Sequence, residues 1–508
     1  MAPVSARRRW WALLSLLFGL LVVGLDITIL NVALPTLAVD LDASTADLQW
    51  IVDAFIVALA ALLLPAGILG DRLGRKKVLL AGLAIFGLAC GLATIADSVG
   101  VLIAARALMG VGAAVVMPVS IAVVPSMFQG AERTRAVALL TAGMAVGLPL
   151  GPLLGGWLLE HYWWGSVFLI NLPLIVIGFF AIAFLLPEST DRNAPKLHLF
   201  ATLAAVVGLA ALVYGVIEAP VDGWLSASTL IGCLGGLALI AAFVASQVRS
   251  PEPMVDLGLF KDRAFLWGSM IATAASMLMM GALFLVPQYL QIVEGHSAFG
   301  TGLRLLPMIG GLMVGGLGAE RLAARFGYRF TVIAGLVLSA AGCALATATD
   351  PGTGFGLVAI WLAVLGAGFG LSLVPATDAV LAALPPDRAA IGSALMQTLR
   401  QTGGAIGVAV FGSIASSVYR SELDLPPLPP EAAHAAEDSV AGAAAVAEAL
   451  GSPETAQQAF DAFTDGMGAV FLVCAVLAVV VACAAGPRFP KHPGAEEAQS
   501  QHEPSRAA

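Results

Sequence analysis

Residues 67–77 read GILGDRLGRKK and stand between two long apolar runs of the chain. Residues 316–327, which read GLGAERLAARFG, occupy the same kind of position between two later runs. The shared core is an acidic residue followed by arginine and leucine, at Asp71 in the first copy and at Glu320 in the second. This recurrence, after the second and after the tenth apolar run, predicts two homologous halves of six spans each, separated by two additional spans.

The composition excludes an ordinary water-soluble protein. The 508 residues are 59% hydrophobic and 11% charged, whereas a soluble domain carries about 25% charged residues. The net charge of -8 argues against a nucleic-acid partner, because no continuous basic face is present. The five cysteines lie in apolar runs outside any C-x-x-C or Cys/His spacing, so we expect no disulfide framework and no metal site.

The apolar runs predict an all-α membrane protein with 14 transmembrane helices. A helix needs about 20 mostly apolar residues to cross the hydrocarbon core, whereas the strands of a membrane barrel would alternate over about ten residues. We predict spans at 10–34, 50–70, 78–96, 101–125, 136–159, 166–186, 199–217, 226–246, 265–292, 301–322, 330–348, 354–373, 392–418 and 467–485.

The distribution of basic residues predicts the orientation. Arginine and lysine gather in every second loop, as in 72–77 after the second span and 133–135 after the fourth. Acidic residues mark the loops between them, for example Asp97 and Glu160. Cytoplasmic loops carry the excess of Lys and Arg, so we expect both termini on the cytoplasmic side.

These patterns divide the chain into five parts: a cytoplasmic N-terminus (1–9), an N-terminal six-helix bundle (10–186), two additional transmembrane helices with their flanking loops (187–264), a C-terminal six-helix bundle (265–486) and a disordered cytoplasmic tail (487–508). The last bundle includes an extracytoplasmic loop, 419–466. Within that loop, Ser452 followed by Pro453 and Glu454 is typical of a helix start. We expect a helical hairpin over the outer face there; the alternative is an unstructured loop.

Three further motifs accompany the repeated loop. Residues 25–35 read LDITILNVALP, residues 105–110 read ARALMG, and residues 143–156 read GMAVGLPLGPLLGG. With residues 67–77, these motifs resemble those of the major facilitator superfamily, specifically its fourteen-span drug:proton antiporters of the QacA type. The resemblance covers essentially the whole chain. It implies the major facilitator fold, a multi-pass location in the bacterial plasma membrane, and antibiotic or multidrug efflux driven by the proton gradient without a cofactor.

Asp26 is the first candidate for coupling protons to substrate. It lies about 22 Å along the first span, past the middle of a core about 30 Å thick. A charge at that depth is costly and usually functional, so we expect Asp26 to face a wet cavity. Desolvation favours the protonated form of a carboxyl group, which suits a reversible proton carrier. The alternative is that Asp26 caps a kink beside Thr28 or Asn31.

Two other charged residues join Asp26 in the proposed coupling set. Asp53 lies near the outer end of the second span, where it could equally be an interfacial acid at a helix start. Arg106 lies within the fourth span and could pair with the acids or tether helices through carbonyl groups. We interpret Asp26, Asp53 and Arg106 as the proton and substrate coupling residues.

Two motifs are candidates for conformational control. The first is an inner-loop gate formed by Gly67, Asp71, Arg72, Gly74 and Arg75, whose charge pairs would latch one state and release another; the alternative is a solvated basic loop that sets topology. The second is an antiporter helix motif, with glycines every four residues that let another helix approach closely and prolines that interrupt the helix; the alternative is simple tight helix packing. Its residues are Gly143, Gly147, Pro149, Gly151, Pro152 and Gly155.

The chain departs from QacA-type pumps where these often carry additional acids in spans ten and thirteen. Leu312, Gln397 and Gln401 are neutral, and Arg400 is positive. We place Asn31, Gln397 and Gln401 at the lining of the substrate cavity. With fewer acids in the membrane, monovalent cations, zwitterions or neutral lipophiles fit better as substrates than divalent cations.

The functional hypothesis is therefore proton-coupled export of lipophilic, cationic or neutral compounds by alternating access, by a monomer in contact with membrane lipid. Export of a specific endogenous metabolite, antibiotic or siderophore is the alternative. A polytopic membrane enzyme is a remote one, because the six histidines form no H-x-x-E-x-x-H pattern, and the one H-x-x-x-D match, His434 with Asp438, lies in the polar loop 419–466. The sequence also lacks the G-x-x-x-x-G-K-[ST] motif of an ATP site.

Overall fold

The computed structural model describes residues 6–191, 197–251, 253–384, 389–425 and 428–491. The predictions for residues 1–5 and for 492–508 of the tail lie outside these ranges. The described residues form helices and no strands, and 14 candidate spans are long and apolar enough to cross a membrane. The helices are α1 (Ala6–Asp40), α2 (Thr45–Leu73), α3 (Arg75–Thr94), α4 (Val99–Met127), α5 (Gly130–His161), α6 (Ser166–Leu169), α7 (Asn171–Leu185), α8 (Leu199–Asp222), α9 (Ala227–Arg249), η1 (Leu257–Lys261), α10 (Arg263–Gln288), η2 (Tyr289–Val293), α11 (Ala298–Arg304), α12 (Leu306–Phe326), α13 (Tyr328–Ala346), α14 (Phe355–Ala382), α15 (Ala389–Glu422), α16 (Pro430–Asp438), α17 (Val440–Leu450) and α18 (Pro453–Ala485).

Local sequence explains where several helices begin and end. Ser44 accepts a hydrogen bond from the amide of Asp47, whose carboxylate accepts one from the Ser44 amide, so a capping box starts α2. Gly74, with φ of 113°, ends α2 and allows α3 to begin at the next residue. Ser452 caps α18, and Pro453 occupies its first turn, as the sequence predicts.

Prolines interrupt two of the predicted spans. The tenth span is divided into α11 and α12, with Pro307 in the first turn of α12. The ninth continues from α10 into the π-helix η2 directly after Pro287. Proline has no N–H to donate to the helix, so the backbone pattern changes at both places.

The long outer segment is more helical than its polarity suggests. α15 continues to Glu422 and α18 already begins at Pro453, so only residues 423–452 connect these two helices. Two short helices, α16 and α17, form within this connection and pack on each other, and α17 also packs on α1 and α18. A hydrogen bond ties this connection to the first half of the chain: Thr45 Oγ1 at the start of α2 donates to the carbonyl oxygen of Asp438 in α16, 2.8 Å away.

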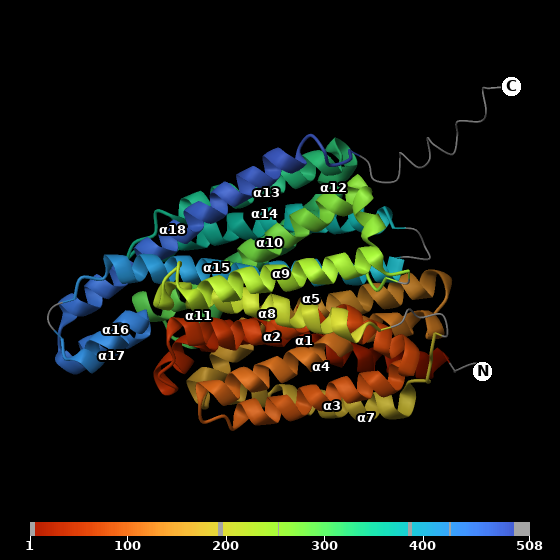
Figure 1. Cartoon of the computed structure of the whole chain (residues 1–508), viewed down its shortest axis with the longest axis horizontal. Coiled ribbons are helices and arrows are strands. Elements are labelled where there is room, and N and C mark those ends of the chain that lie inside the picture. Colours follow the sequence, from red (N-terminus) through yellow and green to blue (C-terminus); the bar gives the residue numbers. More distant parts are fainter. Residues whose placement is uncertain (1–5, 192–196, 252, 385–388, 426–427, 492–508) are drawn as a thin grey trace.

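Two six-helix bundles repeat one packing pattern. In the first bundle (α1–α7), α1 packs on α5, α2 on α4, and α3 on both α4 and α7. In the second bundle (α10–α15 and α18), α10 packs on α15, α12 on α14, and α13 on both α14 and α18. If α10 is taken as the counterpart of α1, and the later helices are matched in chain order, the same pairs of spans pack together in both bundles. This agrees with the repeat in the sequence. Figure 1 shows the first bundle, in red to gold, below most of the second.

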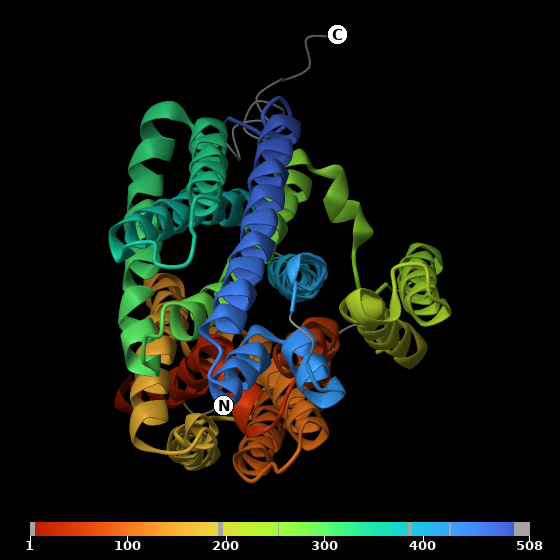
Figure 2. The ribbon, with the colours of Figure 1, turned by 90° about the vertical axis from the view of Figure 1, so that its left-hand side faces the viewer.

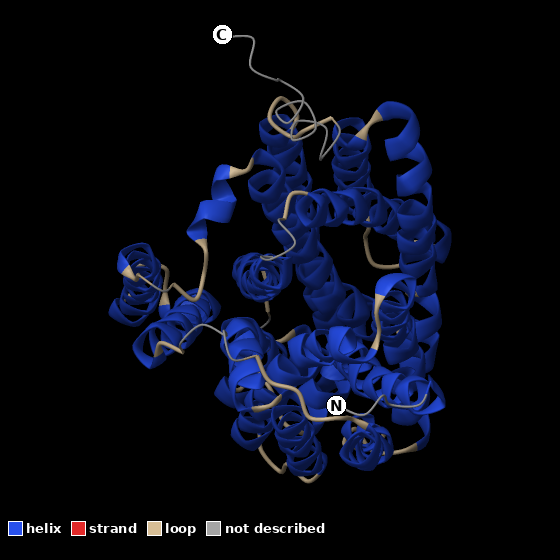
Figure 3. Ribbon diagram, turned by 90° about the vertical axis from the view of Figure 1, so that its right-hand side faces the viewer, coloured by secondary structure: helices blue, strands red, loops and turns tan. Residues whose placement is uncertain are grey.

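The two additional helices lie beside the bundles. α8 and α9 pack on each other, and α8 also contacts α2 of the first bundle and α15 of the second. Figures 2 and 3 show this pair at one side of the molecule. Ser413 of α15 donates a hydrogen bond to the carbonyl oxygen of Val216 in α8, 2.7 Å away. That carbonyl has no helical donor four residues later, because Pro220 stands there.

Candidate functional site

Asp26 and Arg106 form an ion pair inside the first bundle. Arg106 Nη1 on α4 lies 2.6 Å from Asp26 Oδ2 on α1, and the two side chains are 2% and 0% exposed. Arg106 Nε also donates to the carbonyl of Ile51, 3.1 Å away. Its guanidinium lies 4.5 Å from the ring centroid of Phe55. The Asn171 amide on α7 is 3.5 Å from the other oxygen of Asp26.

The expectation that Asp26 faces a wet cavity is wrong for this conformation, because its side chain has no exposed surface. The physical reason is compensation. A buried carboxylate is tolerated when a charged partner and further hydrogen bonds replace water, and Arg106 and Asn171 provide them. The helices that supply these groups all belong to the first bundle, so this charge is neutralised without the second bundle.

Asp53 on α2 has a different environment. Its side chain is 0% exposed, and neither carboxylate oxygen has a hydrogen-bond partner among the described residues. An ionised carboxylate that is buried without a partner is far more costly than one that is paired. The surroundings of Asp53 therefore favour its neutral, protonated form.

Asp53 lies where the two bundles meet. It shares a face of α2 with Gln49, four residues earlier, and Ile56, three residues later. Gln49 Nε2 donates to the carbonyls of Val408 and Ala409 on α15, at 3.0 Å and 2.9 Å. Ile56 also faces α15. Its Cγ2 atom would lie 3.9 Å from a Cβ atom added at Gly404 of that helix. Asp53 thus sits between two contacts to the second bundle.

Hydrogen bonds between the bundles gather near the end where α1 finishes and α2 starts. Besides the bonds of Gln49, Gln291 Nε2 donates to the carbonyl of Val32, 2.8 Å away. The amide of Phe299 donates to Glu160, 3.3 Å away. α11 packs on α5 at this end, where the backbone of Ala298 and Phe299 leaves no space for a side chain at Gly156. These contacts close the seam between the bundles at that end.

The inner loop contacts the segment that follows α7. Asp71 and Arg75 form an ion pair with 2.8 Å between Oδ1 and Nε. The amide of Arg75 donates to the carbonyl of Ser189, and the amide of Lys76 donates to Glu188. Within the same motif, Gly67 packs near Pro118, Arg72 is exposed, and Gly74 adopts its positive φ beside Glu188. The motif therefore joins α2, α3 and the segment that follows α7 within the first half of the chain.

The glycine stripe of α5 packs directly on α1, the helix that carries Asp26. Gly143 faces Leu17, Gly147 faces the backbone around Leu25, and Gly155 faces Ile29. A Cβ at Gly147 would lie 2.7 Å from the backbone nitrogen of Leu25. The absence of side chains thus permits contact between the two helix backbones.

The prolines of this motif add a polar link to the same contact. Pro152 cannot donate to the carbonyl of Leu148, four residues earlier. Thr28 of α1 donates its hydroxyl to that carbonyl instead, at 3.0 Å, and packs closely on Gly151. Pro149 lies in the same interrupted stretch of α5. The motif therefore fixes α5 to the residues that flank Asp26.

We expect Gly147→Leu to destabilise the protein by about 1–3 kcal/mol or more and to abolish transport, because the side chain has only the α1 backbone to enter. Thermal unfolding of the purified protein and efflux from vesicles test this result. Gly91→Leu is the control, since a Cβ at Gly91 of α3 meets no atom of another segment within 4 Å. Wild-type stability and efflux in Gly147→Leu would contradict the close contact.

The three residues expected to line a substrate cavity are placed differently from one another. Asn31 is 3% exposed and donates to the carbonyl of Ile27, so it satisfies its own helix instead of lining an open space. Gln397 and Gln401 are partly exposed on α15. Arg400 lies between them and forms no ion pair with any described residue. This part of α15 presents one cation and two amides.

Several residues of the site escaped the sequence reasoning. Gln49, Asn171 and Glu188 each bind groups on helices or loops that are distant in sequence. Gln49 and Asn171 carried a detectable signal, since a polar amide within an apolar span needs a hydrogen-bond partner. Among the described residues no group of three His, Cys, Asp or Glu side chains is arranged to hold a metal ion.

Comparison with known proteins agrees with this architecture. The model of the Major Facilitator Superfamily matches residues 16–408. The multidrug efflux pump LfrA of Mycolicibacterium smegmatis is 36% identical over 493 residues, covering 95% of this chain and 96% of that protein. The tetracenomycin C resistance and export protein of Streptomyces glaucescens is 30% identical, covering 94% and 91%. The methyl viologen resistance protein SmvA of Salmonella typhimurium is 33% identical, covering 82% and 85%.

Solved structures show the same fold. A bacterial homolog of the human lysosomal transporter Spinster, in an inward-facing conformation, superimposes with a TM-score of 0.67 at 16% identity, covering 96% of this chain and 98% of the other. The nucleoside transporter NupG superimposes with a TM-score of 0.62 at 13% identity, covering 94% and 100%.

Fourteen apolar helices among the described residues, in two repeated bundles with a peripheral pair, agree with the family match and the similar proteins, which indicate a multi-pass membrane transporter. The chain belongs to the Major Facilitator Superfamily.

Proposed function

We propose that this transporter exports lipophilic, cationic or neutral compounds across the bacterial plasma membrane, in exchange for protons and by alternating access. Both termini would lie in the cytoplasm. The names of three relatives support export as the activity, since they describe a multidrug efflux pump, a resistance and export protein, and a resistance protein. No cofactor is needed in this proposal, because the proton gradient supplies the energy.

The observation that carries the proposal is Asp53, a buried carboxyl group at the seam between the bundles that has no partner in the described part of the chain. A proton carrier must gain and lose its proton as its surroundings change. Rocking of the bundles would separate α2 from α15 and expose Asp53, whereas Asp26 would remain beside Arg106 within one bundle. We therefore assign proton exchange to Asp53, with the Asp26–Arg106 pair holding α1 and α4 in place next to it.

Rocking also gives the contacts at the two ends a role. The distribution of basic loops favours an outer location for the end where α1 finishes, and this is the end that the hydrogen bonds of Gln49 and Gln291 close. The conformation would then face the cytoplasm, ready to take up cargo. The paired charges of Asp71 and Arg75 would serve the opposite closure at the inner end.

The proton gradient is sufficient for this task. One proton that enters across 100 mV releases about 2.3 kcal/mol, and each unit of pH difference adds about 1.4 kcal/mol. One proton per cycle would therefore support a gradient of a neutral substrate of about tenfold from one pH unit alone, and of several hundredfold when 100 mV is added.

Arg400 bears on the charge of the cargo. Arg400 lies on α15 between Gln397 and Gln401 and has no ion-pair partner among the described residues. Such a cation repels a second positive charge, so monovalent or neutral compounds fit better than divalent cations. Export of one endogenous antibiotic is the second candidate function. It is favoured by the relative whose name records both resistance to and export of tetracenomycin C, and which matches 94% of this chain.

The test is an efflux panel in inside-out vesicles with an imposed pH gradient, using ethidium as a monovalent cation, methyl viologen as a divalent cation and a neutral lipophilic dye. We expect pH-driven transport of ethidium and the neutral dye and little transport of methyl viologen. Transport of none of the compounds, or transport that is indifferent to the pH gradient, would refute the proposal. Transport of one natural product only would favour the second candidate.

A further inference from the structure

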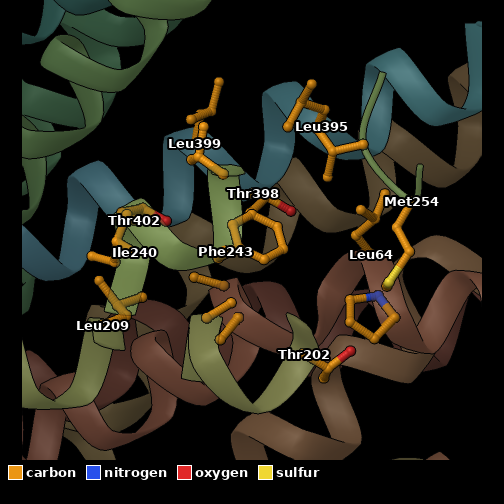
Figure 4. A pocket seen from close by; sticks show the side chains of 16 residues that line it. Leu64, Thr202, Leu209, Ile240, Phe243, Met254, Leu395, Thr398, Leu399 and Thr402 are labelled. Carbon is orange, nitrogen blue, oxygen red and sulfur yellow. The ribbon is translucent and has the colours of Figure 1, made fainter. Parts of the chain in front are cut away.

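A cavity of about 210 Å³ separates the peripheral helices from the seam between the bundles. Figure 4 shows that its walls come from α8 and α9 on one side and from α2 and α15 on the other. Most lining side chains are apolar, including Leu64 of α2, Phe243 of α9 and Leu395 of α15. The cavity is therefore suited to a lipophilic ligand.

Two threonine hydroxyl groups in this apolar wall have no hydrogen-bond partner among the described residues. They are Oγ1 of Thr202 on α8 and Oγ1 of Thr398 on α15, and both atoms are buried. Threonine in a helix can satisfy its hydroxyl on the preceding turn, as Thr94 and Thr273 do with carbonyls four residues earlier. Buried polar groups are normally paired, so a ligand that carries a hydrogen-bond acceptor would satisfy these two hydroxyl groups, which lack a described partner and line one cavity.

One lining residue of the cavity is exposed at the protein surface, and another lies on the helix that carries the proposed coupling residue. Val244 lines it and is 40% exposed on the outer surface of α9. On the opposite wall, Ala60 lies seven residues after Asp53 on the same face of α2, a distance of about 10 Å along the helix. A ligand in this cavity would thus lie between the bilayer and the seam where Asp53 is buried.

We propose that this cavity binds the cargo as it leaves the membrane, and that the preferred cargo is a small lipophilic molecule with a carbonyl or similar hydrogen-bond acceptor. The acceptor would receive hydrogen bonds from Thr202 and Thr398, and the apolar body would fill the space beside Phe243. A volume below the range of about 300–1,000 Å³ typical of drug sites selects compact molecules of one or two fused rings. This inference rests on the proposed export function and names its substrate class.

Binding is tested with Prodan, a naphthalene dye whose carbonyl oxygen accepts hydrogen bonds and whose emission reports its surroundings. The full chain in lipid nanodiscs is titrated with Prodan, and empty nanodiscs provide the background. We expect the Thr202→Val/Thr398→Val double variant to bind about tenfold more weakly, because two hydrogen bonds are lost and the shape is kept. We expect Ala205→Trp, which fills the cavity, to abolish the saturable signal.

Matched controls separate the cavity from general effects. Leu203→Trp adds the same ring to α8 on a surface that is 52% exposed, and Thr94→Val removes a hydroxyl from α3, away from the cavity. Both should bind Prodan as the wild type does. A dye without the carbonyl, 2-dimethylaminonaphthalene, should not distinguish the double variant from the wild type. Equal Prodan affinity in the wild type, the double variant and Ala205→Trp would overturn the site.

The cargo role is tested by transport. Prodan added to inside-out vesicles with an acidic lumen should collapse the pH gradient through the wild type, and several times more slowly through Ala205→Trp. A wild-type rate in Ala205→Trp, after Prodan binding has been lost, would overturn the role in cargo entry. A wild type that binds Prodan in the cavity but transports no compound of the efflux panel would refute the export function and leave the binding site standing.

Discussion

Asp53→Asn is expected to eliminate efflux against a pH gradient and to leave only downhill leak, while the protein still inserts and folds. Asparagine has nearly the same size as aspartate but cannot release or take up the exchanged proton. Asp53 is the relevant acid because it is buried at the seam between α2 and α15 and has no described partner. Substrate-induced proton release from acid-loaded vesicles measures the loss directly.

Two variants make this result interpretable. Asp53→Glu keeps a titratable carboxyl group and should retain part of the proton-driven efflux. Asp97→Asn removes an acid from the exposed loop that follows α3, near the same end of the molecule, and should have no effect. Wild-type coupling in Asp53→Asn would exclude this residue as the carrier.

Arg106→Met is expected to destabilise the protein by about 3–5 kcal/mol, the usual consequence of removing one partner from a buried ion pair. Asp26 would then be left at 0% exposure with only the 3.5 Å contact to Asn171. The variant also loses the hydrogen bond to the carbonyl of Ile51 and the contact with the ring of Phe55. Chemical unfolding in detergent micelles measures the change.

The double variant Asp26→Asn/Arg106→Met completes a mutant cycle, because it removes both charges together. It should recover most of the stability lost in Arg106→Met, whereas purely additive losses would argue against the ion pair. The same variant tests the assignment of roles. If Asp53 is the proton carrier, a folded double variant keeps proton-driven efflux; a folded double variant without coupling would return that role to Asp26.

The sequence was sufficient for the helices and their repeat. Apolar runs of span length are a strong signal, because backbone polar groups in lipid must be satisfied within the segment. The repeated acid-Arg-Leu loop indicated the two bundles, whose helix pairs proved equivalent. Helix ends were harder to predict where polar residues continue a helix beyond the membrane. α18 therefore begins at Pro453, 14 residues before the apolar run by which it was predicted.

The environment of each charged residue was beyond the sequence. Asp26 and Arg106 are 80 positions apart, and only the packing of α1 on α4 brings them to 2.6 Å. The depth of Asp26 in its span therefore suggested a wet cavity. The ion pair with Arg106 instead allows Asp26 to be buried away from water. Asp53 looked interfacial for the opposite reason. It lies near the end of its span, but α15 covers that end, and no spacing within α2 records the approach of a helix about 350 residues later.

Two helix crossings share one construction. At each crossing, a proline leaves the carbonyl group four residues earlier without a helical donor, and a hydroxyl group on the neighbouring helix donates to that carbonyl instead. Thr28 donates to Leu148, and Ser413 donates to Val216. Such a joint adds one side-chain hydrogen bond to the packing of two helices, and it satisfies a carbonyl group that the proline leaves without a helical donor. The first joint articulates α1 with α5, and the second attaches the peripheral pair to α15. In the proposed rocking motion, this bond would tie the peripheral pair to the second bundle, while the contact of α8 with α2 would have to change as the seam opens.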